Sequence, residues 1–238
     1  MPVAIEPSSA EQLANEIASR IRSLPSRRTE PVRGVRREFS KRLAKSPPEY
    51  VIDVALRLLN KPGIDRFVAY EIIKHHRASL ASLRQKQLEQ FGNGIDEWGE
   101  VDCFACYLAG PAWREHQVPD KVIHRWARSK DRWWRRAALV STVPLNSKAQ
   151  GGNGDTARTL EVCGLLAGDR DDMVVKAMSW ALRELSKRDP KSVRQFLDKH
   201  HGLVAARVLR EVSNKLSTGL KNPTRNAPRS AEKRTSFV

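Results

Sequence analysis

Long apolar runs and secretory features are absent from this sequence of 238 residues. No run of about 18 apolar residues occurs, although a membrane-spanning helix needs roughly that many. The first residues, MPVAIEPSSAEQL, contain no basic segment followed by an apolar one, so they do not resemble a secretory signal peptide. These absences predict a soluble, intracellular protein.

Cysteine is scarce, with three residues in the whole chain. Cys103 and Cys106 form a C-x-x-C pair, but on an apolar helical face and without a second pair of ligands. Three cysteines make no even disulfide framework, so the pattern favours a reducing compartment. We expect both thiols to be buried and inert, with a redox or metal site as the weaker alternative.

No other group of residues predicts a metal ion or a cofactor. The histidine pairs at 75–76 and 200–201 are expected to end or join helices, where a cation complements the helix dipole. Asp169, Asp171 and Asp172 cluster at a predicted helix start and are interpreted as caps rather than as magnesium ligands. The segment Ser147 to Asp155 is rich in glycine but lacks the Lys-Ser/Thr of a phosphate-binding P-loop, and we interpret it as a mobile loop.

Acidic residues are too few to balance the basic ones. The chain has 43 Lys and Arg against 27 Asp and Glu, a formal net charge of +16 and a sequence pI near 10.3. The basic residues are spread through the apolar, periodic part of the chain as well as its C-terminal end, so a charged tail alone does not explain the excess. An extended polyanion is therefore the expected partner.

Strand patterns are missing, whereas apolar residues recur at helical spacing almost everywhere. One stripe comprises Leu13, Ile17, Ile21 and Leu24, and another comprises Val51, Val54, Ala55, Leu58 and Leu59. Helix starts are predicted at Ser8 with Glu11 as a capping box, after Pro47-Pro48 and after Pro119. Breaks are predicted at Pro62-Gly63, Gly92 to Gly94, Gly110-Pro111 and Ser147 to Asp155. The chain is therefore expected to be all-α.

Two similar segments of the sequence suggest how these helices are arranged. Asp131 to Ala137 (DRWWRRA) and Asp171 to Ala177 (DDMVVKA) share an Asp, a basic residue and an Ala at a separation within the range of HEAT-like repeats. We predict a flexible N-terminus over residues 1–8, a HEAT-like helical repeat superhelix with a basic concave face over 9–217, and a basic disordered tail over 218–238. A compact helical bundle is the alternative.

Three segments carry the residues that suggest chemistry. In the helix predicted over Ile95 to Ala109, Trp98 and Asp102 stand four residues apart and therefore share a face. In Trp126 to Ser141, Arg135 and Arg136 follow a tryptophan pair, and at least one arginine is expected to reach phosphate. In Val174 to Arg188, Trp180 lies in mid-helix near Arg183. Taken singly, each segment is explained as well by core packing or by surface charge.

Together, these segments resemble the DNA alkylation repair glycosylases of the AlkD family, which are built from HEAT-like repeats. The resemblance covers roughly residues 30 to 217 and includes W-x-x-x-D at Trp98, the W-x-x-R-A-A string from Trp133, and A-x-x-W-x-L-R-E from Ala177. It implies that Asp102 is the catalytic carboxylate, that Arg136 contacts the DNA backbone, and that Trp98 and Trp180 flank the lesion. Further DNA contacts are expected from Arg135, Lys176 and Arg183.

The resemblance also implies a reaction. A monomer would bind double-stranded DNA in the cytoplasm, associated with the nucleoid, and would hydrolyse the N-glycosidic bond of cationic N3- or N7-alkylated purines without base flipping. Asp102 would stabilise the oxocarbenium-like transition state, so no cofactor or metal is implied. The stretch Arg27 to Phe39 lacks the tyrosine that frames the lesion in the family member compared, which leaves the lesion preference open. The alternatives are a non-catalytic binder of distorted or branched DNA and, less favoured by charge, a protein-binding scaffold.

Overall fold

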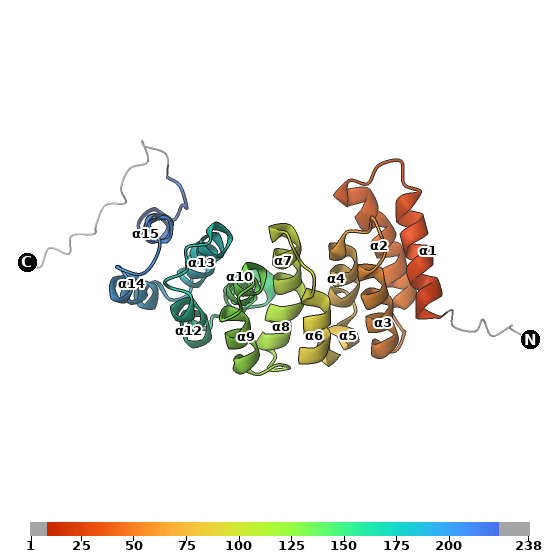
Figure 1. Cartoon of the computed structure of the whole chain (residues 1–238), viewed down its shortest axis with the longest axis horizontal. Helices are drawn as coiled ribbons and strands as arrows, with labels where there is room; N and C mark the ends of the chain where they lie inside the picture. The colour runs from red at the N-terminus through yellow and green to blue at the C-terminus, as the bar shows by residue number, and fades with distance from the viewer. Residues whose placement is uncertain (1–8, 224–238) are drawn as a thin grey trace, which may run out of the picture. The chain divides into compact units, whose positions relative to one another are not determined.

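The computed structural model describes residues 9–223, and these form helices without any strand (Figure 1). The predicted all-α class is therefore confirmed. The Cα positions cluster into two compact units that divide after Val122, inside helix α9 (Asp120–Ala127), and each unit is described by itself. Among the described residues, no helix is long and apolar enough to cross a membrane.

Unit 1, which ends at Val122, arranges its helices in two rows. One row runs from α1 through α3 to α6, and the other runs from α2 through α4 to α7, with α5 against α3 and α4. Each helix thus packs on its partner and on the equivalent helix of the next pair, as expected for helical repeats. The helices are α1 (Ala10–Arg22), α2 (Thr29–Leu43), α3 (Pro48–Leu59), α4 (Arg66–Lys74), α5 (Arg77–Ser82), α6 (Gln85–Gly92), α7 (Trp98–Phe104), the π-helix η1 (Ala105–Ala109) and α8 (Gly110–Arg114).

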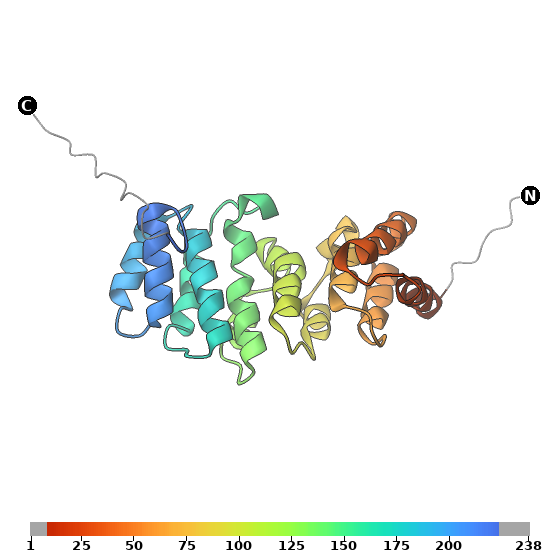
Figure 2. The same cartoon turned by 90° about the horizontal axis from the view of Figure 1, so that it is seen from above.

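Unit 2, which begins at Ile123, repeats this plan. Helices α10, α13 and α15 pack side by side in one row, and α12 packs on α14 in the other (Figure 2). The elements after α9 are α10 (Arg132–Val140), α11 (Val143–Asn146), the 3-10 turn η2 (Lys148–Gln150), α12 (Thr156–Leu165), α13 (Asp172–Leu185), α14 (Pro190–Lys199) and α15 (Ala206–Thr218).

The two similar segments, 131–137 and 171–177, occupy equivalent positions in two neighbouring helices. Asp131 is the N-cap of α10 and accepts from the backbone N–H of Trp133, while Asp171 is the N-cap of α13 and accepts from that of Met173. Because α10 and α13 pack against each other in the same row, the two aspartates start equivalent helices of successive repeats. The interpretation as a repeat is confirmed at this point of the chain.

The first helix starts one residue later than predicted. The capping box consists of Ser9 and Gln12: the Ser9 hydroxyl accepts from the Gln12 N–H at 3.2 Å, and the Gln12 side chain accepts from the Ser9 N–H at 2.8 Å. Ser8 lies outside the described residues. Glu11 instead pairs with Arg57 of α3 at 2.7 Å and with Lys61, which follows the end of that helix. The predicted starts after Pro47 and Pro119 are confirmed.

The break predicted at Gly110-Pro111 is wrong, because the helical path continues from Trp98 to Arg114. Proline lacks an N–H and its ring clashes with the carbonyl four residues earlier, so it normally ends or kinks a helix. Here the preceding turn widens into a π-helix, in which the Gly110 N–H donates to the Ala105 carbonyl five residues back. The wider turn accommodates Pro111 without interrupting the helix.

The glycine-rich segment is a break as predicted, and hydrogen bonds connect it to the neighbouring helices of unit 2. The side-chain amide of Asn146 donates to the Thr142 carbonyl and to the Thr159 hydroxyl, both at 2.9 Å. Arg188, which follows the end of α13, donates to the carbonyls of Asn146 and Gly152 at 2.9 and 2.7 Å. These hydrogen bonds fix the backbone on both sides of the turn η2.

The remaining predicted breaks are confirmed. Helix α3 ends before Pro62-Gly63, and α6 ends at Gly92 with Asn93 as its C-cap. The histidine pairs behave as expected, since His75 and His200 are the C-caps of α4 and α14 and His76 is the N-cap of α5.

Candidate nucleic-acid interface

Trp98 and Asp102 lie one turn apart at the start of α7. Val101 and Phe104 are the buried residues of this helix, whereas Trp98 is 58% exposed and Asp102 is half-buried. A tryptophan this exposed gives up much of the free energy that its large ring would gain by burial. The helix thus brings the two predicted residues together, with an exposed aromatic ring one turn from a carboxylate.

The neighbouring thiols are free cysteines without the chemistry of a redox pair. Cys106 is buried and Cys103 is half-buried. Burial first, and then the negative charges of Asp102 and Glu71, raise the pKa of Cys103 to about 11. The Cys103 thiol is therefore protonated at neutral pH, as expected for an inert cysteine.

The α2 and α4 helices place basic side chains beside α7 and η1. On α4, Glu71 is buried and accepts hydrogen bonds from Arg33 and Arg36 of α2, at 2.8 and 3.0 Å. One turn later on α4, the ammonium group of Lys74 lies 3.7 Å from the ring centre of Tyr107, which belongs to η1. Sequence reasoning did not single out these residues. The signal was a glutamate within the apolar stretch FVAYEIIK, where burial requires a cationic partner.

In unit 2, both predicted arginines of α10 have intramolecular partners. Arg135 donates from Nε to Asp169 at 2.7 Å and from Nη1 to two backbone carbonyls. Arg136 is 5% exposed and donates from Nη1 to the Met173 carbonyl at 2.6 Å. Arg136 thereby ties α10 to the start of α13, and its contact with DNA stays a prediction.

The tryptophans around α10 divide between core and surface. Trp126 is buried, and its ring centre lies 4.9 Å from that of the half-buried Trp134. Arg132, which sequence reasoning did not select, has a side chain that is 52% exposed and lies over the Trp133 ring at 4.8 Å. Arg132 is thus the more exposed cation at the start of this helix.

Helix α13 carries the other three predicted residues of unit 2. Trp180 is half-buried, and Lys176 is exposed and pairs with Asp172 at 2.6 Å. Arg183 donates to the Ser179 hydroxyl at 3.2 Å, and Ser179 donates to the buried Glu211 of α15 at 2.6 Å. Burial lowers the pKa of Arg183, while the negative charge of Glu211 opposes that change.

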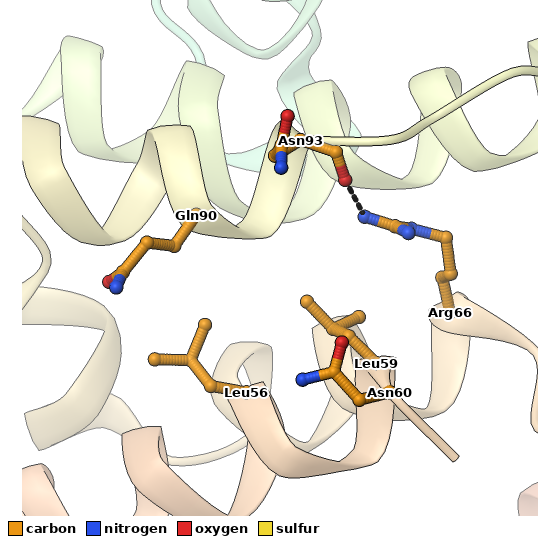
Figure 3. A pocket seen from close by; sticks show the side chains of 6 residues that line it. All are labelled: Leu56, Leu59, Asn60, Arg66, Gln90 and Asn93. Atoms are coloured by element: carbon orange, nitrogen blue, oxygen red, sulfur yellow. Dashed lines mark hydrogen bonds between the residues drawn. The ribbon is translucent and has the colours of Figure 1, made fainter.

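A pocket of unit 1 lies away from these residues, between α3 and α6 (Figure 3). Arg66 borders it and donates to the carbonyls of Asn93 at 2.6 Å and Phe91 at 3.0 Å. None of the predicted site residues lines this pocket, and the arginine that borders it is engaged in holding the end of α6. Among the described residues there is also no group of three or more His, Cys, Asp or Glu side chains that would hold a metal ion.

A family model described as DNA alkylation repair enzyme matches residues 6–216 of the chain. The match extends over both units and includes every residue predicted to act on or bind DNA. No curated protein and no solved structure matches the chain.

Proposed function

The chain belongs to the DNA alkylation repair enzyme family, and from this premise we propose that it is a DNA glycosylase. Its substrates would be cationic N3- or N7-alkylated purines in duplex DNA, whose N-glycosidic bond it hydrolyses. The observation that carries this proposal is the pair on α7, an exposed Trp98 one turn before a half-buried Asp102.

The substrate determines what the protein must supply. An alkyl group on N3 or N7 makes the purine a cation and a good leaving group, so the reaction needs little protonation of the base. As the bond to the sugar breaks, positive charge develops on the sugar ring, and a fixed carboxylate stabilises that charge. Asp102 would perform this role and orient the attacking water. The base leaves as a neutral molecule with the electron pair of the C–N bond, the water oxygen becomes the new hydroxyl of the sugar, and the second water proton is released to solvent.

Aromatic rings are the second part of the proposed site, because they attract the cationic base. The face of a tryptophan ring attracts a cation, and the attraction reaches about 2 kcal/mol when water is excluded. Trp98 presents an open ring to a cationic base without any rearrangement of the core. In unit 2, Trp180 is proposed to contact the same nucleotide, following the family resemblance.

The DNA backbone would be held by cationic side chains of unit 2. We assign this role to the exposed Lys176 and, from the resemblance, to Arg135, Arg136 and Arg183. Because Arg136 is buried against the Met173 carbonyl, it acts either by exchanging that contact for a phosphate or by fixing α10 against α13. The enzyme would act as a monomer on stacked duplex DNA, with the base left in the helix.

A second candidate is a non-catalytic binder of distorted or branched DNA, which the excess of 43 basic over 27 acidic residues supports equally well. Such a protein would need the basic surface but not the carboxylate. It would bind DNA with a strong salt dependence and would release no base.

One experiment separates the two functions. Release of 7-methylguanine and 3-methyladenine from methylated duplex DNA is measured for the wild type, for Asp102→Asn, and for Asp198→Asn as a control that removes an exposed carboxylate of α14. Loss of one electrostatic contact to a transition state typically costs about 100- to 1,000-fold in rate. We expect such a loss in Asp102→Asn, with DNA binding preserved, and no change in Asp198→Asn. Binding without base release by the wild type would instead support the non-catalytic binder.

A further inference from the structure

Apart from the pair on α7, unit 1 contains a buried carboxylate whose only described hydrogen bonds come from two arginines. Glu71 is 3% exposed, and its two oxygens accept separately from Nε of Arg33 at 2.8 Å and Nε of Arg36 at 3.0 Å. A buried carboxylate without cationic partners would be very costly, so Glu71 fixes the position of both arginines. The two pairs join α4 to α2 at defined points.

The two arginines differ in what they offer to a ligand. The side chain of Arg36 is 8% exposed, whereas that of Arg33 is 36% exposed and lies 5.7 Å from the ring centre of Phe67. Contact through Nε uses one of the five N–H donors of a guanidinium group. The terminal nitrogens of Arg33 therefore retain a planar set of donors, while Glu71 holds the guanidinium group through Nε and the Phe67 ring lies against it.

A second cation lies on the same helix as Glu71. Lys74 is exposed, and the ring of Tyr107 holds its ammonium group at 3.7 Å. Arg33, Arg36 and Lys74 together exceed the charge of Glu71, so the cluster is net positive. It also lies close to α7: the charges of Arg33 and Lys74 oppose the rise in the pKa of Cys103, which burial causes first and the charge of Asp102 second.

We propose that Arg33 and Lys74 form a clamp for phosphates of the DNA backbone, and that Glu71 is the positioning residue that aims Arg33 at its phosphate. Planar, pre-positioned guanidinium groups bind phosphate through paired hydrogen bonds, while an ammonium group contributes a compact point charge. The identity of the ligand rests on the proposed action on DNA, whereas the clamp itself requires no catalysis. It would anchor the strand in unit 1, beside the helix that carries Asp102.

The test measures affinity of the full chain for a short, unmodified DNA duplex by fluorescence anisotropy over a range of salt concentrations. Each phosphate contact contributes close to one unit to the slope of log K against log salt. We expect Arg33→Gln and Lys74→Gln each to reduce that slope by about one. Arg20→Gln removes an arginine of α1 that pairs with Glu38 at 3.2 Å, and we expect it to leave the slope unchanged.

Glu71→Gln tests positioning separately from charge. If Glu71 contributed only its negative charge, its removal would strengthen binding to a polyanion. A positioning role predicts the opposite, an affinity lowered several-fold because Arg33 is released. Arg33→Lys keeps the charge and loses the planar donors, so we expect a nearly unchanged slope with weaker binding. Because Arg33→Lys leaves the buried carboxylate in place, it tests the planar donors even if Glu71→Gln does not fold.

An unchanged slope in Arg33→Gln, or tighter binding in Glu71→Gln, would overturn the clamp. Because the duplex is unmodified and no base is released, these outcomes do not depend on the glycosylase reaction. Base excision with an unaltered slope in Arg33→Gln would leave the proposed function standing without the clamp. A reduced slope in Arg33→Gln, together with no base excision by the wild type, would support the clamp and refute the glycosylase function.

Discussion

Truncation of Trp98 to alanine is expected to separate activity from stability. Full burial of a tryptophan removes about 150–250 Å² from water, worth about 5 kcal/mol at 25 cal/mol per Å². Since Trp98 is 58% exposed, less than half of this is at stake, and we expect the free energy of unfolding to fall by at most about 2 kcal/mol. Losing the ring face against a cationic base costs about 1–2 kcal/mol of transition-state binding, or roughly 5- to 30-fold in kcat/KM.

The matched control for Trp98 is Trp113 of α8, which is 0% exposed. Truncation of a buried tryptophan typically costs about 3–5 kcal/mol, so Trp113→Ala is expected to melt far below Trp98→Ala. Thermal unfolding and single-turnover excision of 7-methylguanine would be measured for both variants and for Trp98→Phe, which keeps an aromatic face. Full activity in Trp98→Ala would refute the assignment of the ring to the lesion. A loss of stability as large as that of Trp113→Ala would refute the reasoning from exposure.

Two further predictions concern stability alone. At Gly152, an added Cβ would overlap the carbonyl oxygen of Pro144. We therefore expect Gly152→Ala to lower the melting temperature by several degrees, and an unchanged melting curve would contradict the tight packing of this turn. Hydrogen bonds from Lys61 and Arg57 lower the pKa of Glu11 from 4.5 to about 2, so its contribution to stability is present above pH 4.5 and is lost as the pH falls towards 2. We expect melting temperatures of Glu11→Gln to be less sensitive to pH in that window than those of the wild type, and parallel curves would argue against the pairing.

The sequence predicted the helical elements well where local signals determine them. Asp131 and Asp171 are the N-caps of equivalent helices, because a carboxylate at that position satisfies backbone N–H groups whatever the distant packing. Gly110-Pro111 misled the prediction because the cost of proline depends on the turn before it, and a π-helical turn accommodates the ring. Periodicity alone gives no sign of that widening.

The candidate site was predictable in its residue types and less so in its contacts. Helical spacing put Trp98 and Asp102 on one face, and the structure keeps them there. The burial of Arg136 could not be predicted, because its partner is a backbone carbonyl that the fold brings from the next repeat. Likewise, the contact of Glu71 with Arg33 joins residues 38 positions apart, and no local pattern specifies that distance.

The π-helical turn also sets the phase of the helix in which it lies. At about 100° per residue, an unbroken α-helix would turn Trp113 to within about 20° of Asp102, so both side chains would point the same way. With one extra residue taken up by the widened turn, Trp113 is rotated back by about 100°. It is fully buried, whereas Trp98 and Asp102 remain open to the surface. Deleting one residue from Ala105–Ala109 would therefore bring the two halves of the helix back into phase and force either the tryptophan out of the core or the carboxylate into it.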